Sequence, residues 1–234
     1  MTGKNRTWKT AFGLPAFILL GVTAFGAFLR LSNLGAPSLW IDEALFAGWV
    51  QGTPHQEFPT LLLAKLLPTD EFYLRLPVAV AGSLTIAAFY YVTGQGWKSL
   101  YGAAFIAVFP VFVFWSRVAR PYAFAGLFIV LGWRWWWFYI VAVLTTPAAL
   151  IGVNLLRLRE PRYRLYYAGL LALAIGVYLF RPDVKQAGDF FDPYFLITQK
   201  RFWYVPILAL LLYICSGISD KHFTPDSTKK IRRS

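Results

Sequence analysis

Cysteine, histidine and acidic residues are all scarce in this chain. It has one cysteine, Cys215, which excludes an intrachain disulfide. Its two histidines, His55 and His222, are too few and too far apart to indicate a metal site. Only 15% of the 234 residues are charged, whereas 58% are hydrophobic and 19% are aromatic. A soluble domain of this length could not bury so much apolar surface. The composition therefore predicts an integral membrane protein.

The charged residues that are present are mostly basic. Lysine and arginine number 23 against 11 acidic residues, which gives a formal net charge of +12. In a soluble protein this excess would suggest nucleic-acid binding, but no recognition motif accompanies it, and nucleic acid is not expected as a partner. The basic residues gather between apolar runs and in the tail, residues 219–234, where they would contact anionic membrane lipids and orient the chain.

Apolar runs divide the chain into segments that match the thickness of a bilayer, about 20 residues for a core of roughly 30 Å. The first run follows three basic residues, exceeds the apolar part of a usual secretory signal and lacks a convincing cleavage site. We therefore expect an uncleaved first span with a cytoplasmic N-terminus. The predicted spans cover residues 11–31, 72–93, 100–115, 165–180 and 202–216.

Residues 121–156 do not divide into simple spans. Residues 123–132 cover only about 15 Å as a helix, and the sequence Thr145-Thr146-Pro147 is expected to break the run that follows. The arginines between residues 157 and 164 and the basic tail both belong in the cytoplasm, which requires an even number of crossings overall. We therefore expect short, broken or re-entrant helices here, buried against other helices.

The predicted fold class is all-α, a multi-pass helical bundle with about six to eight membrane helices. It forms a single integral membrane domain over residues 1–234, with both termini in the cytoplasm and a first outer loop at about residues 32–70. In that loop Ile41, Leu45 and Trp49 recur at helical spacing, which predicts an amphipathic helix on the outer surface, and residues 59–67 predict a second short helix. A transporter is disfavoured, because no internal repeat is visible and no ionisable residue lies convincingly in mid-span.

Three ordered stretches resemble one family. LRLSNLGAPSLWIDEA, residues 29–44, is similar to the opening of the GT-C fold glycosyltransferases that use polyprenyl-phosphate sugars, among them protein O-mannosyltransferases and aminoarabinose transferases. EFYLRLPVAVAG, residues 71–82, resembles their second-span signature, and SRVARPYAFAGLF, residues 116–128, resembles the signature after the third span. The chain departs from the family at Glu57-Phe58-Pro59, where members usually carry His-Pro-Pro, and members tend to be considerably longer.

The resemblance implies a glycosyltransferase of the inner (cell) membrane that moves a sugar, with inversion, from a polyprenyl-phosphate donor to an acceptor on the extracytoplasmic face. Phosphate leaves without needing a proton, so one carboxylate suffices as general base. By the resemblance Asp42 is that base, and Glu43 orients the acceptor or a neighbouring cation. From the residues alone, the pair equally fits an outer helix beginning near Leu39, whose positive end it would complement. No cofactor is assigned, and the use of a divalent metal is left open.

Arginine suits the departing phosphate, because its planar fork binds two oxygens and never loses its proton. By the resemblance Arg117 and Arg120 are candidate phosphate ligands, with Arg75 and Tyr122 beside them. The alternative for the arginines is that their side chains reach from span ends to lipid headgroups. The alternative for Tyr122 is an ordinary position in the interfacial aromatic belt.

Two residues of the first outer loop, Trp40 and Glu57, are candidates to line the acceptor site. Trp40 otherwise anchors the outer helix in the interface, and Glu57 is otherwise a solvated loop acid. A second functional hypothesis is a non-catalytic membrane subunit, derived from such an enzyme, that packs against a partner subunit in a larger membrane complex. The short chain favours this hypothesis, whereas the joint presence of the acidic pair and the two arginines favours the enzyme.

Overall fold

The computed structural model describes residues 14–36, 66–68, 70–154, 161–180 and 204–216, and these residues form helices and no strand. The predicted all-α class is therefore confirmed for this part of the chain. The elements are α1 (Leu14–Leu31), α4 (Glu71–Val92), α5 (Trp97–Val108), α6 (Pro110–Trp115), α7 (Tyr122–Arg134), α8 (Phe138–Thr145), the 3-10 helix η2 (Pro147–Gly152), α9 (Pro161–Phe180) and α12 (Tyr204–Ser216).

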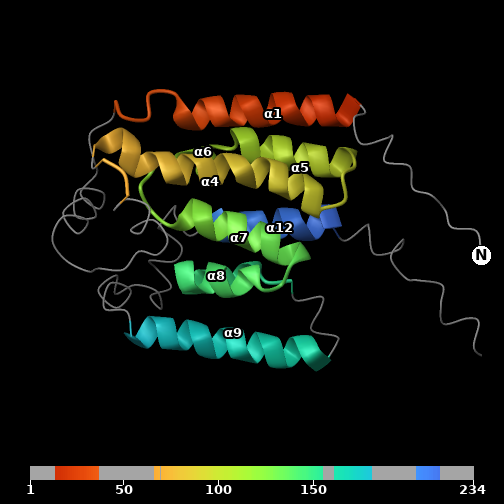
Figure 1. The fold of residues 1–234 in the computed structure, drawn as a ribbon. Helices are drawn as coiled ribbons and strands as arrows, with labels where there is room; N and C mark the ends of the chain where they lie inside the picture. The colour runs from red at the N-terminus through yellow and green to blue at the C-terminus, as the bar shows by residue number, and fades with distance from the viewer. Residues whose placement is uncertain (1–13, 37–65, 69, 155–160, 181–203, 217–234) are drawn as a thin grey trace, which may run out of the picture.

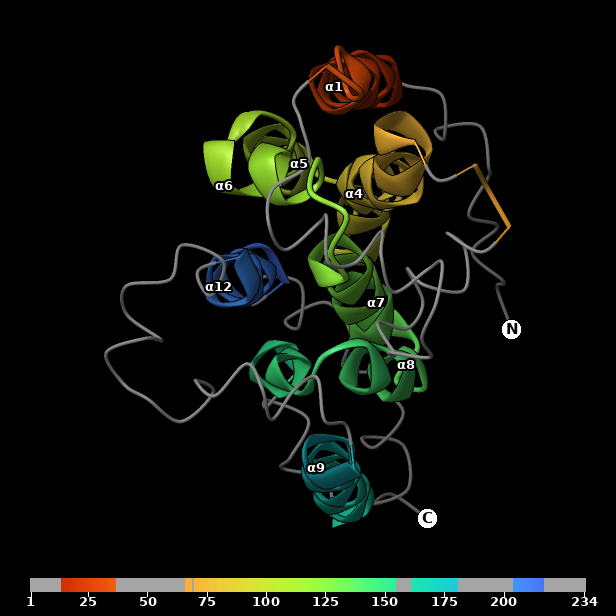
Figure 2. The same cartoon turned by 90° about the vertical axis from the view of Figure 1, so that its left-hand side faces the viewer.

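The helices lie side by side with their long axes in similar directions (Figure 1). In the end-on view α4 and α7 occupy the middle, with α1 and α9 on opposite outer sides (Figure 2). Helix α4 packs against α1, α5 and α7. At one end of the bundle α1 ends, α4 begins, α6 ends and α7 begins (Figure 1). We call this the motif end, because all three stretches that resemble the glycosyltransferase family reach it.

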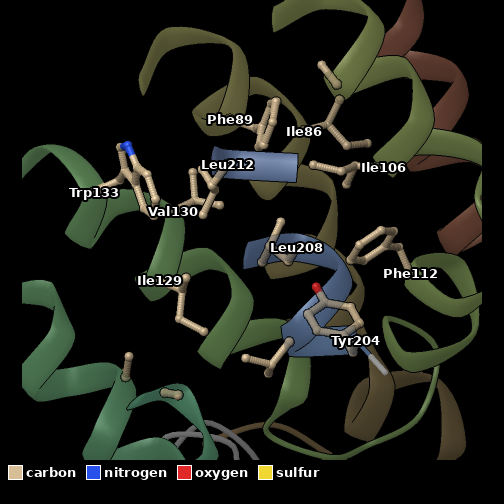
Figure 3. Close-up of a cluster of buried hydrophobic side chains, with 14 of the residues drawn as sticks. Ile86, Phe89, Ile106, Phe112, Ile129, Val130, Trp133, Tyr204, Leu208 and Leu212 are labelled. Carbon is tan, nitrogen blue, oxygen red and sulfur yellow. The ribbon is translucent and has the colours of Figure 1, made fainter. Parts of the chain in front are cut away.

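The interior is an apolar cluster to which α4, α5, α6, α7 and α12 all contribute (Figure 3). Helix α12 supplies Tyr204, Leu208 and Leu212, each at most 1% exposed, although it lies about 100 residues beyond its partners in the chain. The ring of Tyr204 meets Phe112 of α6 edge-on, with the centroids 4.8 Å apart. Such edge-to-face pairs stabilise a core beyond the area they bury. Helix α12 is therefore an integral part of the bundle.

Glycines mark the points where helices approach most closely. A Cβ atom on Gly126 of α7 would lie 2.5 Å from Cε1 of Tyr204, and one on Gly102 of α5 would lie 2.5 Å from Cε1 of Phe89. Small residues at such positions let helices approach closely, as is common where helices associate within lipid. The two glycines thus allow close packing of aromatic rings against α7 and α5.

Large apolar side chains also cover much of the outside. Along α1 the exposed face carries Leu14, Phe17, Leu20, Phe25 and Phe28, each more than half exposed. Among the described helices, α1 and α4 are long and apolar enough to cross a membrane, judged by length and composition. Apolar surface of this extent requires lipid or another protein against it.

Most predicted spans correspond to helices with closely similar ends, as α1, α4 and α12 show. The predicted span at residues 100–115 is instead divided into α5 and α6, because Phe109 is extended (φ −65°, ψ 127°) and Pro110 follows it. For the predicted segment 121–156, the described residues 121–154 form short, broken helices, as expected: α7, α8 and η2. The amphipathic helix predicted in the first outer loop lies outside the described residues, as does the second helix except for residues 66 and 67, which form a turn.

Candidate functional site

The backbone turns sharply where α1 ends at the motif end. The amide of Ser32 still donates to the carbonyl of Phe28 (2.8 Å), and then Asn33 takes a left-handed conformation (φ 52°), which asparagine tolerates better than most residues. The amide of Ala36 closes the turn on the carbonyl of Asn33 (3.2 Å). The last carbonyls of a helix lack partners within the helix, so this turn presents acceptors that other groups must satisfy.

Two arginines from distant motifs satisfy those carbonyls. Nη2 of Arg117 donates to the carbonyls of Ser32 (2.9 Å) and Asn33 (3.3 Å), and its Nη1 lies 3.4 Å from the carbonyl of Leu29. Nη1 of Arg75, which is 3% exposed, donates to the carbonyl of Leu34 (2.9 Å). Positive charge is favourable at the negative end of a helix dipole. The structure thus joins all three motif stretches at one turn.

The predicted site residues fall into two groups. Arg75, Arg117, Arg120 and Tyr122 lie in described segments at the motif end, the latter two in the turn after α6 and at the start of α7. The ring of Tyr122 meets Trp115 edge-on, with the centroids 5.1 Å apart. The other four predicted residues lie outside the described residues, so their positions stay predictions: Trp40, Asp42, Glu43 and Glu57.

Sequence reasoning missed a third arginine, Arg30, in the last turn of α1. This residue is 0% exposed, and its Nη1 donates to the carbonyls of Gly26 (2.8 Å) and Ala107 (2.9 Å). Its Nη2 donates to the carbonyl of Ile106 (2.8 Å). The available signal was a cation inside an apolar span together with Pro110 inside another, because a proline in a helix leaves a carbonyl without its donor.

Burying the cation of Arg30 is energetically expensive unless hydrogen bonds compensate. Removing an ion from water costs several kcal/mol even after the surroundings relax. Three charge-assisted hydrogen bonds to carbonyls offset this cost, and each is stronger than a bond between neutral groups. Two of those carbonyls belong to the final turn of α5, where the helix dipole is negative. The fold therefore uses helix ends, rather than an acidic side chain, to hold this charge.

Gly82 of α4 provides the space that Arg30 and Ser116 fill, and Gly82→Ala is expected to destabilise the protein. The added Cβ would meet Oγ of Ser116, would lie 2.5 Å from its Cβ, and would approach Nε of Arg30 to 3.2 Å. Ser116 is 0% exposed and donates to the carbonyl of Phe112 (2.6 Å), so it has little room to move. We expect a loss of about 1–3 kcal/mol, measured as a lower midpoint of thermal unfolding in detergent.

The matched control is Gly21→Ala on α1, where a Cβ would meet no atom within 4 Å. This variant should keep or slightly raise the unfolding midpoint, because alanine favours a helix over glycine by about 1 kcal/mol. Equal midpoints for the two variants would contradict the close packing of Gly82 against Ser116.

No metal-binding cluster among the described residues and no similar protein identifies further residues of this site. Among the described residues, no group of three histidine, cysteine or acidic side chains is placed to hold a metal ion. No protein-family model, curated protein or solved structure matches the chain. The candidate site is therefore defined by its own geometry: a turn at the end of α1 onto which arginines of the second and third motifs converge.

Proposed function

We propose that the protein is a membrane glycosyltransferase that transfers a sugar from a polyprenyl-phosphate donor to an acceptor at the motif end of the bundle. The observation that supports this most is the convergence of three sequence motifs. Residues of the first motif accept hydrogen bonds from Arg75 of the second and Arg117 of the third, which stand about 40 and 85 residues away in the chain. The three motifs occur in the same order as in the enzyme family that they resemble, and in the structure they also lie together.

The roles follow from what each group can do chemically. Asp42 is the general base that accepts the proton of the acceptor, assisted by Glu43. Asp42 follows Ala36, the end of the described turn, by six residues, and six residues span at most about 20 Å. Arg120 binds the departing phosphate, where a fixed cation stabilises developing negative charge. Arg117 and Arg75 hold the turn from which the acidic pair extends.

In this proposal the bundle crosses the membrane several times. Five crossings would be α1, α4, the α5–α6 pair, α9 and α12. The short helices α7, α8 and η2 would together make a sixth, broken crossing. Support comes from Figure 1, in which the start of α1 and the end of α12 lie at the same end of the bundle. An even number of crossings would place both termini in the cytoplasm, together with the basic tail. The motif end then faces the extracytoplasmic side.

A transfer assay tests the proposed activity. The full chain, purified into lipid nanodiscs, would be incubated with radiolabelled polyprenyl-phosphate mannose, glucose or aminoarabinose and with a membrane extract that supplies acceptors. We expect time-dependent transfer of label from at least one donor, and none after heat denaturation of the protein. Absence of transfer from every donor would contradict the proposal.

One observation favours a second candidate function, a non-catalytic subunit of a larger membrane complex. Arg75 and Arg117 donate to backbone carbonyls, a structural use that requires no donor phosphate. In that case the motif end would be a surface that contacts a partner subunit. The subunit function predicts no transfer by the purified chain, and transfer by this chain alone would exclude it.

A further inference from the structure

We infer that Arg30 is a positioning residue, which holds the break between α5 and α6 against the end of α1 and thereby keeps Arg117 and the turn before Asp42 in place. The inference concerns the geometry of the motif end, and it rests on the proposed glycosyltransferase function only for the reaction that this geometry serves. Arg30 itself need not touch the substrate.

The first step is that the break in the helix creates the acceptors that Arg30 uses. Pro110 has no amide hydrogen, so it cannot donate to the carbonyl of Ile106 as residue 110 of a continuous helix would. Phe109 is extended, so the chain leaves the helical path after it. The carbonyl of Ala107 therefore also lacks a donor from its own helix. Nη2 and Nη1 of Arg30 donate to these two carbonyls at 2.8 and 2.9 Å. Arg30 thus caps α5 from another helix.

The second step is that the contacts between α1 and the α5–α6 segment run in both directions. Arg30 reaches from α1 to the end of α5, while Arg117 reaches back from the end of α6 to the carbonyls of Ser32 and Asn33. Between the two contacts lies only the six-residue helix α6. Such a short helix transmits a displacement of its start to its end. Release of Arg30 should therefore move Arg117 relative to the turn.

The third step is that Arg30 fits in a confined space, so its position is closely defined. Helix α4 approaches through Gly82, where a Cβ would lie 3.2 Å from Nε of Arg30. Nε is buried without a hydrogen-bond partner, so the two Nη groups make the hydrogen bonds of this guanidinium. An uncharged side chain of similar length would fill the space but would leave the carbonyls of Ile106 and Ala107 without a donor.

A distance measurement tests this inference without relying on activity. Spin labels at Ala36→Cys and Phe114→Cys, both exposed positions, would report the separation of the turn and α6 by dipolar electron paramagnetic resonance. The experiment uses the full chain in nanodiscs, with Cys215→Ser removing the native thiol. Arg30→Met should lengthen or broaden the distance distribution and lower sugar transfer at least tenfold, since small misplacements of reacting groups are costly. Arg134→Met, an exposed arginine at the other end of α7, should change neither.

A second substitution shows whether Arg30 is needed to position Arg117 or only to donate hydrogen bonds to the free carbonyls of α5. In Arg30→Met/Pro110→Ala, residue 110 gains an amide that can donate to the carbonyl of Ile106. We expect the unfolding midpoint to recover while the distance distribution stays broad and transfer stays low, because a straightened α5–α6 segment carries Arg117 elsewhere. If the unfolding midpoint, the distance distribution and the rate of transfer all returned to their wild-type values, the positioning role would be overturned.

The conservative variant keeps the test decisive if Arg30→Met does not fold. Arg30→Lys retains the charge, but a single ammonium lacks the planar fork that reaches carbonyls on two helices. It should broaden the distance distribution by a smaller amount. A distribution identical to the wild type in the folded Arg30 variants would overturn the inference. If the wild type transfers no sugar while the Arg30 variants broaden the distribution, the proposed function fails and the positioning role of Arg30 stands.

Discussion

Replacing Asp42 by asparagine is expected to lower sugar transfer by about 10²- to 10⁴-fold, the usual contribution of a general base. The amide has nearly the shape of the carboxylate but cannot accept the proton of the acceptor. Phosphate needs no proton to leave, so the proposed reaction has a single essential acid–base group. The measurement is the initial rate of transfer from a labelled polyprenyl-phosphate sugar in nanodiscs, with the unfolding midpoint as the check that the fold is intact.

The neighbouring carboxylate provides the matched control. Glu43→Gln should reduce transfer by about tenfold or less, because an orienting group contributes less than the base itself. The reverse order, with Glu43→Gln the more damaging variant, would move the base to Glu43. Unchanged transfer by Asp42→Asn would remove Asp42 from the mechanism and favour the interpretation in which both acids complement a helix dipole.

The helices were predictable to the extent that apolar pattern determines them. Long apolar runs gave α1, α4 and α12 with closely similar ends, because a helix is the simplest way for such a run to satisfy its backbone. The division into α5 and α6 was missed because the run at residues 100–115 is apolar throughout, and only Pro110 marks the break. Apolar composition identifies a membrane span, but whether the span is one continuous helix depends on a single backbone amide, which Pro110 lacks.

The contacts of the arginines were not predictable in the same way. Arg75 and Arg117 were recognised by their position at span ends and by the motifs around them, but their acceptors are backbone carbonyls about 40 and 85 residues away. Arg30 was missed because its partners, the carbonyls of Ile106 and Ala107, become available only through a break in another helix. Carbonyls are present at every residue, so apart from Pro110, which marks the end of α5, the sequence carries no signal for which of them will accept.

The scarcity of acids gives these contacts a common physical origin. With 23 basic and 11 acidic residues, the chain has too few carboxylates to pair every cation. Helix ends carry about half a negative charge and carbonyls without partners, so they serve as acceptors in place of acids. Arg30 donates to carbonyls in the last turn of α5, and Arg75 and Arg117 donate to carbonyls of the turn that follows α1. Backbone carbonyls, unlike carboxylates, hold a cation without carrying a full negative charge of their own.

Arg117→Met is expected to lower both stability and transfer, which distinguishes it from Arg120→Met. Loss of the hydrogen bonds to Ser32 and Asn33 removes charge-assisted contacts worth about 2 kcal/mol, or about 4–8 °C in the unfolding midpoint. Transfer should fall about 100-fold, because the turn before Asp42 is no longer held in place. The measurements are the unfolding midpoint and the rate of transfer against donor concentration.

Arg120→Met should act on the donor instead. If Arg120 binds the departing phosphate, its loss should lower the transfer rate by about 10²- to 10³-fold with a smaller change in the unfolding midpoint than Arg117→Met produces. The two variants therefore separate the arginine that holds the turn from the arginine that meets the phosphate. A large drop in the unfolding midpoint for Arg120→Met, with Arg117→Met remaining stable but inactive, would exchange the two roles. Wild-type transfer by both variants would remove Arg117 and Arg120 from the mechanism, because neither the arginine assigned to the phosphate nor this arginine of the turn would then be required.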